Sequence, residues 1–172
     1  MGEDKALLPF PPYDTLIEFQ FRKLSKIFQN VFISSKTPFH FQAPIIYDIE
    51  DTFAPTIGFI SIFQTLQCEK FFAISVDTPF IDKTIISTLI QNDHPTNDAT
   101  IAKTSHKTHP LCGIYHKSLQ NHFINMVQQN NHKLGYLLQN VKTKYIFFQD
   151  EKLFLNLNNK HQYHQALTQI LL

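Results

Sequence analysis

Apolar residues recur along the chain in two alternating spacings, one typical of helices and the other of short buried strands. The helical spacing predicts helices over residues 14–28, 56–66, 82–90, 117–129, 133–138 and 160–172. The short apolar runs predict strands over residues 31–33, 44–47, 71–76, 99–103, 111–115, 145–148 and 154–157. Strands that alternate with helices favour an α/β fold of three layers, in which helices cover both faces of a mainly parallel sheet.

The length of the chain indicates a single domain. A chain of 172 residues lies in the range where one domain with its own core is the usual organisation. The sequence contains no internal repeat, no low-complexity tract and no change of composition that would mark a linker. We therefore expect residues 1–172 to form one layered domain.

Charge and hydropathy exclude several kinds of partner. Fifteen basic and 14 acidic residues leave a net charge of +1, which is not the basic footprint of a nucleic-acid-binding protein. The apolar runs fall far short of the roughly 20 residues that cross a bilayer, and the first residues do not resemble a signal peptide. Two distant cysteines, Cys68 and Cys112, suit a reducing compartment. We expect a cytoplasmic protein without nucleic-acid or membrane partners.

The residues that follow each predicted strand are the first candidates for a functional site. In open parallel sheets the ligand crevice lies beyond the carboxyl ends of the strands, which selects Ser34, Asp48, Asp77 and His109. A carboxylate at such a position can bind Mg²⁺, which prefers hard oxygen ligands and often shares its coordination with substrate phosphates. Asp77 is the best-placed candidate. On spacing alone, Asp77 could equally be a turn residue, and for Asp48 a turn role is favoured, because Asp is common in the turns that follow strands.

Several well-known motifs are absent from the sequence. Nine histidines fit no local zinc signature, and there is no HExxH, GxSxG, P-loop or GxGxxG sequence. The chain contains only four glycines. These absences disfavour hydrolases of the nucleophile-elbow type and Rossmann dehydrogenases.

Four segments, taken together and in order, resemble one enzyme family. The segment Met1-Gly2-Glu3-Asp4-Lys5-Ala6-Leu7-Leu8-Pro9-Phe10 resembles the second half of the signature LAGGxSxRMGxDKxLLxF of nucleotidyltransferases that build molybdenum cofactor dinucleotides. Asp77-Thr78-Pro79-Phe80 resembles the metal-site motif of that family, and His109-Pro110-Leu111-Cys112-Gly113-Ile114-Tyr115 resembles a later motif. Phe154-Leu155-Asn156-Leu157-Asn158 is similar to a late strand with alternating asparagines. The guanylyltransferases are the most similar branch.

The resemblance implies a Rossmann-like nucleotidyltransferase fold and a specific reaction. The phosphate of molybdopterin would attack the α-phosphorus of Mg·GTP, release pyrophosphate and leave the guanine dinucleotide form of the cofactor. Lys5 would neutralise phosphate charge and Asp77 would bind Mg²⁺. Ser34 and Asp48 match positions that contact the guanine nucleotide, while His109, Asn156 and Asn158 would lie on the acceptor side. Molybdenum cofactor carrier proteins and acceptor enzymes are further partners that the resemblance implies.

The first half of the signature, a buried strand followed by a glycine-rich loop, has no counterpart in the sequence. Backbone N–H groups of such a loop would bind the triphosphate. We therefore expect the domain to be N-terminally incomplete, with low stability and weak activity as the chain is written. Two alternatives stay open: a nucleotidyltransferase that uses another phosphate acceptor, such as a sugar phosphate, and an inactive truncated remnant.

Overall fold

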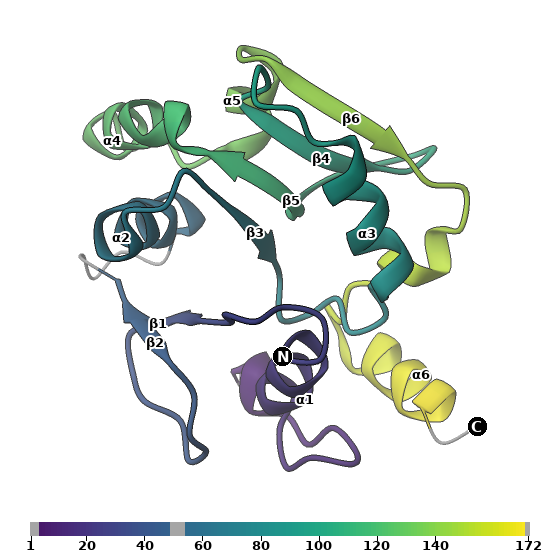
Figure 1. Cartoon of the computed structure of the whole chain (residues 1–172). Coiled ribbons are helices and arrows are strands. Elements are labelled where there is room, and N and C mark those ends of the chain that lie inside the picture. Colours follow the sequence, from purple (N-terminus) through teal and green to yellow (C-terminus); the bar gives the residue numbers. More distant parts are fainter. Residues whose placement is uncertain (1–3, 49–53, 171–172) are drawn as a thin grey trace.

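The strands of the computed structural model form two separate sheets, and the structure describes residues 4–48 and 54–170. The smaller sheet pairs β1 (Ile33–Ser35) with β2 (Ile45–Tyr47) in parallel. The larger sheet has the order β3-β5-β4-β6 (Figure 1). Its strands are β3 (Lys70–Ile74), β4 (Ala99–Lys103), β5 (Thr108–His116) and β6 (Thr143–Phe147).

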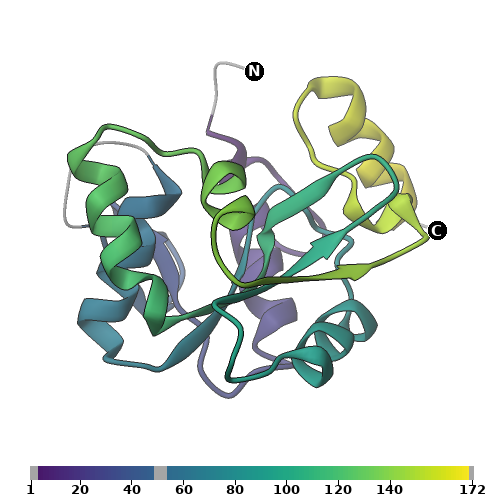
Figure 2. The same ribbon diagram turned by 90° about the horizontal axis from the view of Figure 1, so that it is seen from above.

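Helices cover both faces of the larger sheet, as the sequence predicts. Figure 2 shows α2 beside α4 on one side of the sheet and α3 on the opposite side. The α-helices are α1 (Leu16–Leu24), α2 (Pro55–Leu66), α3 (Lys83–Asn92), α4 (Gln120–Gln128), α5 (Leu134–Gln139) and α6 (Lys160–Ile170). Three short 3₁₀ helices are η1 (Lys5–Leu7), η2 (Lys117–Leu119) and η3 (Glu151–Phe154). Within the described residues, no helix is long and apolar enough to span a bilayer.

Alternation along the strands divides the buried residues between the two faces. Ile101 of β4 and Tyr115 of β5 pack with α2, α4 and α5, whereas Ala102 and Cys112 pack with α1 and α3. Successive side chains of a strand point to opposite faces, so each strand contributes to both cores. A third cluster joins the N-terminal turn to α1 and α6 through Phe10, Leu16, Leu157 and Ala166.

The structure corrects three details of the sequence-based expectation. The predicted strand 154–157 is not one, because η3 ends at Phe154 and the following residues form no ladder. Strand β5 runs antiparallel to β3 and β4, although β3, β4 and β6 share one direction. Helix α1 spans Leu16–Leu24 rather than the predicted 14–28, and Thr15 caps it, because its Oγ1 accepts a hydrogen bond from the N–H of Glu18.

Candidate functional site

A cavity of about 330 Å³ opens beyond the carboxyl end of β3. Three of the residues predicted from the sequence line it, namely Asp77, His109 and Asn156. The loop after β3 contributes Ser75, Asp77 and Thr78, and the start of β5 contributes His109. The cavity therefore lies beyond the carboxyl end of a strand, which is where ligands bind in open parallel sheets.

Asp77 is held in place on both sides of its carboxylate. The Ser75 hydroxyl donates a hydrogen bond of 2.6 Å to Oδ1, and the Nζ atom of Lys5 lies 3.7 Å from Oδ2. The side chain of Asp77 is 14% exposed, so one edge of the carboxylate faces the cavity. This arrangement gives a partly desolvated acid next to a cation, which is a strong electrostatic environment for a charged ligand.

Lys5 is positioned by two distant parts of the chain. Its Nζ atom donates a hydrogen bond of 2.9 Å to Oδ1 of Asn158, in addition to its ion pair with Asp77. Its backbone belongs to η1, whose first turn is capped by the carboxylate of Asp4. Three predicted residues, Lys5, Asp77 and Asn158, thus meet at one point although they lie far apart in the sequence.

The segment with alternating asparagines is fastened to the backbone of Asp77. The N–H of Leu157 donates a hydrogen bond of 2.9 Å to the carbonyl oxygen of Asp77, and the Leu157 side chain is fully buried. Burial of Leu157 leaves the two flanking amides on the other side of the chain. Asn156 consequently lines the cavity and Asn158 binds Lys5.

Two side chains of helix α1 donate hydrogen bonds to the loop that contains Asp77 and to the residues that follow it. The buried Gln20 donates from Nε2 to the carbonyl oxygens of Ser75 and Thr78, each at 3.1 Å. Lys23, one turn later, donates from Nζ to the carbonyl oxygens of Pro79 and Ile81 at 2.7 and 3.0 Å. Burial lowers the pKa of Lys23 to about 8, an effect that Asp82 partly opposes. The Ser75 carbonyl also accepts a hydrogen bond from the Thr78 hydroxyl, and the bonds from α1 satisfy the other carbonyl groups of this tight loop.

His109 forms a neutral wall of the cavity. Burial, followed by the charge of Lys107, lowers the pKa of His109 to about 4, so its ring is uncharged at pH 7. Its Nε2 atom lies 3.2 Å from the Thr104 hydroxyl, and its ring packs against Phe154 at a centroid distance of 4.4 Å.

Ser34 and Asp48 meet each other but do not line the cavity. The Ser34 hydroxyl donates a hydrogen bond of 2.8 Å to Oδ1 of Asp48, across the parallel pair β1 and β2. Gly58 of α2 packs directly against them, because a Cβ atom there would lie 2.7 Å from Ser34 Oγ. Pro55, at the start of the same helix, lines the cavity, so α2 connects this pair to the Asp77 side.

The Asp77 environment fits a magnesium ion that is shared with phosphates. Asp77 offers a hard oxygen ligand, and the amide of Asn156 lines the same cavity. Within the described ranges, Asp77 belongs to no cluster of three histidine, cysteine or acidic ligands. A single carboxylate suits Mg²⁺ bound largely through substrate oxygens and water, rather than a closed structural site.

Several site residues are not predictable from local sequence patterns. Gln20, Ser75, Lys107 and His132 all contact the Asp77 loop or line the cavity. His132 also lies 2.7 Å, through Nδ1, from the hydroxyl of the buried Thr56. The serine two residues before Asp77 is the only one of the four with a nearby sequence signal, because Ser and Asp favour such local turns.

Two solved structures share the fold of this chain. A protein from Archaeoglobus fulgidus, "molybdopterin-guanine dinucleotide biosynthesis protein A", aligns with a TM-score of 0.84 over 98% of this chain and 91% of its own, at 18% identity. A putative protein from Aquifex aeolicus aligns with a TM-score of 0.75 over 84% and 80% of the two chains, at 25% identity. The fold is that of the nucleotidyltransferases.

Sequence comparison identifies the family within that class. Residues 1–143 match the model of the MobA-like NTP transferase domain. A molybdenum cofactor guanylyltransferase of Campylobacter jejuni is 35% identical over 99% of this chain and 90% of its own length, and one of Helicobacter pylori is 36% identical over 95% and 81%. The chain belongs to the MobA-like NTP transferase family, which confirms the resemblance found in its motifs.

Proposed function

We propose that this chain is a molybdenum cofactor guanylyltransferase, which transfers GMP from GTP to the molybdenum-molybdopterin cofactor. The observation that carries the proposal is the meeting of Lys5, Asp77 and Asn158 beside a cavity at the end of β3. Relatives at about 35% identity with that name, aligned over nearly the whole chain, support the same activity. The nucleotidyltransferase fold supports it as well.

In the proposed reaction, the molybdopterin phosphate attacks the α-phosphorus of GTP. A new P–O–P bond forms, the bond between the α-phosphorus and its bridging oxygen to the β-phosphate breaks, and pyrophosphate leaves. Phosphoryl transfer of this kind depends mainly on positioning and on charge stabilisation. Bound Mg²⁺ would supply part of that stabilisation, held by the carboxylate of Asp77.

The side chains of the cavity have distinct proposed tasks. Lys5, whose Nζ atom lies 3.7 Å from Asp77, would direct its charge towards a phosphate, and Asn158, which accepts a hydrogen bond from that Nζ atom, orients the ammonium group. The neutral ring of His109 and the amide of Asn156 line the acceptor side. Neither side chain carries a negative charge, so neither repels an incoming phosphate. Ser34 and Asp48 contact the guanine nucleotide next to α2.

The remaining partners follow from the reaction. GTP and molybdopterin are the two substrates. Cofactor carrier proteins would supply the molybdopterin cofactor, and acceptor enzymes would receive the product. We place the protein in the cytoplasm, where GTP is present and both of its free cysteines, Cys68 and Cys112, would stay reduced.

Product analysis tests the proposal directly. The chain is incubated with Mg²⁺, molybdenum-loaded molybdopterin and GTP, ATP, CTP or UTP in turn, and the dinucleotide is identified by mass spectrometry. The expected result is a guanine dinucleotide and one equivalent of pyrophosphate, with GTP alone. Pyrophosphate release that requires a sugar phosphate instead of molybdopterin would overturn the assigned acceptor, and a preference for another base would overturn the assigned nucleotide.

A further inference from the structure

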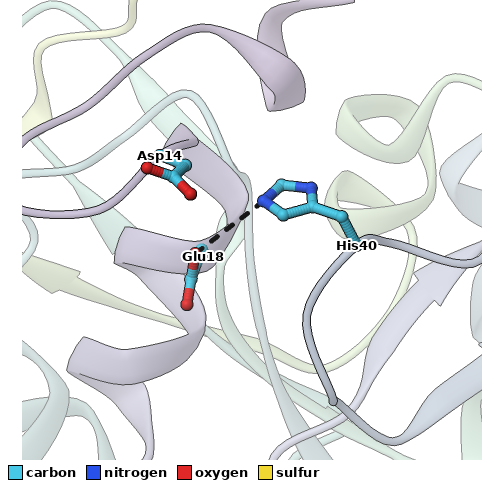
Figure 3. Close-up of side chains that lie close together, drawn as sticks. All are labelled: Asp14, Glu18 and His40. Atoms are coloured by element: carbon cyan, nitrogen blue, oxygen red, sulfur yellow. Dashed lines mark ion pairs between the residues drawn. The ribbon is translucent and has the colours of Figure 1, made fainter.

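Three side chains converge at the start of α1, and none of them lines the candidate active site. They are Asp14, which precedes the Thr15 cap, Glu18 in the first turn, and His40 in the connection between β1 and β2. One ligand atom of each lies within 4.8 Å of the ligand atoms of the other two. Figure 3 shows the imidazole ring of His40 directed at the two carboxylates from the opposite segment.

The two oxygens of the Glu18 carboxylate have different partners. Oε1 accepts hydrogen bonds from Nε and Nη2 of Arg22 at 3.3 and 3.2 Å, and Oε2 faces Nε2 of His40 at 4.0 Å. Arg22 therefore fixes the orientation of the carboxylate and leaves Oε2 available. The Glu18 side chain is only 12% exposed, whereas that of His40 is 49% exposed, so the site can be reached from solvent.

Aromatic contacts hold the His40 segment against α1. The ring of Phe41 packs against Phe21 of α1 at 5.8 Å and against Phe39 at 5.9 Å between ring centroids. The guanidinium group of Arg22 lies 6.0 Å from the ring of Phe41. The same residue that orients Glu18 thus also contacts the neighbour of His40, so the position of the histidine is built by packing rather than left to a free loop.

The Asp14 carboxylate is the unpaired member of the group. In the part of the chain that the structure describes, it makes no hydrogen bond or ion pair. Two carboxylates this close repel each other, and a cation between them would remove that repulsion.

We propose that Asp14, Glu18 and His40 form a site for a divalent transition-metal ion, best suited to Zn²⁺. One imidazole nitrogen with two carboxylate oxygens is a ligand set that Zn²⁺ accepts, whereas Mg²⁺ prefers oxygen ligands alone. Bonds of roughly 2.0–2.2 Å would place ligand atoms about 3.4 Å apart. The exposed side chains of Asp14 and His40 close the remaining gap by rotation, and water completes the coordination.

A metal here would tie the β1–β2 connection to α1. That connection leads into β2, and Asp48 follows at the end of that strand. Helix α1, through Gln20, supports the loop of Asp77. The ion would therefore act as a structural clamp between the parts of the chain that carry Asp48 and Asp77, and it would take no part in the transfer reaction.

Zinc binding to the whole chain tests the proposal. Zn²⁺ is titrated by calorimetry at pH 7.5 into the wild-type protein in excess Mg²⁺, which occupies Asp77. The variants are His40→Ala and Glu18→Gln. The matched control is His106→Ala, because His106 also faces a single carboxylate, Glu151, at 3.9 Å but has no third ligand.

We expect one equivalent of Zn²⁺ to bind, with an affinity that falls at least tenfold in His40→Ala and in Glu18→Gln and changes less than twofold in His106→Ala. Asp77→Ala should bind Zn²⁺ as the wild type does, which separates this site from the proposed active site. Equal losses in His40→Ala and His106→Ala, or a stoichiometry without a dominant site, would show adventitious binding to surface histidines and overturn the proposal. Circular dichroism checks that each variant is folded.

Discussion

The two halves of the proposed site are built in different ways. Asp77 sits at the end of the four-stranded sheet and is held by Ser75, by Lys5 and, through its backbone, by Leu157. Ser34 and Asp48 sit on a sheet of two strands of three residues each, and within the described residues their side chains bond to each other alone. One half is fixed by contacts from distant segments, and the other is formed by a local pair.

This difference predicts that the two halves of the site have different roles in the reaction. Charge stabilisation in phosphoryl transfer requires groups that are already positioned, which suits the half that contains Asp77. Contacts to a nucleotide base can form and adjust on binding, which suits the exposed pair. We therefore expect substitutions on the Asp77 side to reduce turnover and substitutions in the Ser34–Asp48 pair to reduce GTP affinity.

The largest expected effect is that of Asp77→Asn. The amide keeps the shape of the side chain but removes the charge that would hold Mg²⁺, so kcat should fall by about 100-fold or more. Pyrophosphate release at saturating GTP measures this effect. Asp150→Asn, at an exposed turn, is the control and should keep full activity. If Asp77→Asn kept turnover within twofold of wild type, Asp77 would not hold the Mg²⁺ ion that the reaction needs.

Gln20→Met should have the next largest effect, and it tests whether distant support matters for the Asp77 half. The substitution removes the Gln20 donor from the carbonyl groups of Val76 and Thr78, while the Ser75 carbonyl keeps its bonds from Thr78, so the free energy of unfolding should fall by about 2 kcal/mol. Urea denaturation measures this change, and kcat should fall with it. Gln165→Met, on the exposed face of α6, should change neither quantity. An unchanged urea midpoint for Gln20→Met would show that the Asp77 loop is stable without the hydrogen bonds from Gln20.

A smaller effect is expected from the pH dependence of His109. The folded pKa of about 4 lies below the ordinary value of 6.5, so the unfolded state binds the proton more readily. The contribution of His109 to stability is therefore complete above pH 6.5 and is lost as the pH falls from 6.5 towards 4, by about 1–2 kcal/mol. Urea midpoints at pH 7 and pH 4.5 should converge in His109→Gln relative to the wild type. Identical pH slopes would contradict the buried, neutral ring.

The smallest effect is expected at the local pair. Ser34→Ala removes one hydrogen bond to Asp48, so the KM for GTP should rise about two- to tenfold while kcat stays within twofold. Steady-state kinetics with varied GTP separates the two parameters. Ser35→Ala, at the neighbouring position, should leave KM unchanged. A fall in kcat without a change in KM would remove the distinction between the two halves.

The sequence predicted most elements but not the contacts that join them. The apolar run before Asp77 indicated both the strand and the acid at its end, because burial on two faces leaves a clear hydrophobic signal. The segment 154–157 was wrongly predicted as a strand, since its alternation serves to bury Leu157 beneath Asp77 instead of forming a ladder. The antiparallel direction of β5, in a sheet expected to be mainly parallel, could not be predicted because strand direction leaves no mark in local periodicity.

The long-range contacts that position the site residues could not have been predicted from the spacing of residues in the sequence. Gln20 reaches the loop 55 residues later, and His132 reaches Thr56 76 residues earlier. Lys5 was selected by family resemblance alone, because a single lysine near a chain end carries no local signal. The group of Asp14, Glu18 and His40 could not be predicted from spacing either, because its members come from two segments that the fold brings together.

The most direct test of the central claim is a melting experiment with nucleotides. The wild type and Asp77→Ala are melted with Mg²⁺ and each of GTP, ATP, CTP and UTP, because a ligand at 100 times its Kd adds about 2.7 kcal/mol, or roughly 5–10 °C for a chain of this size. We predict a shift of this order for the wild type with GTP alone, and its loss in Asp77→Ala. An equal shift in both proteins, or none with any nucleotide, would contradict a magnesium-dependent GTP site at Asp77.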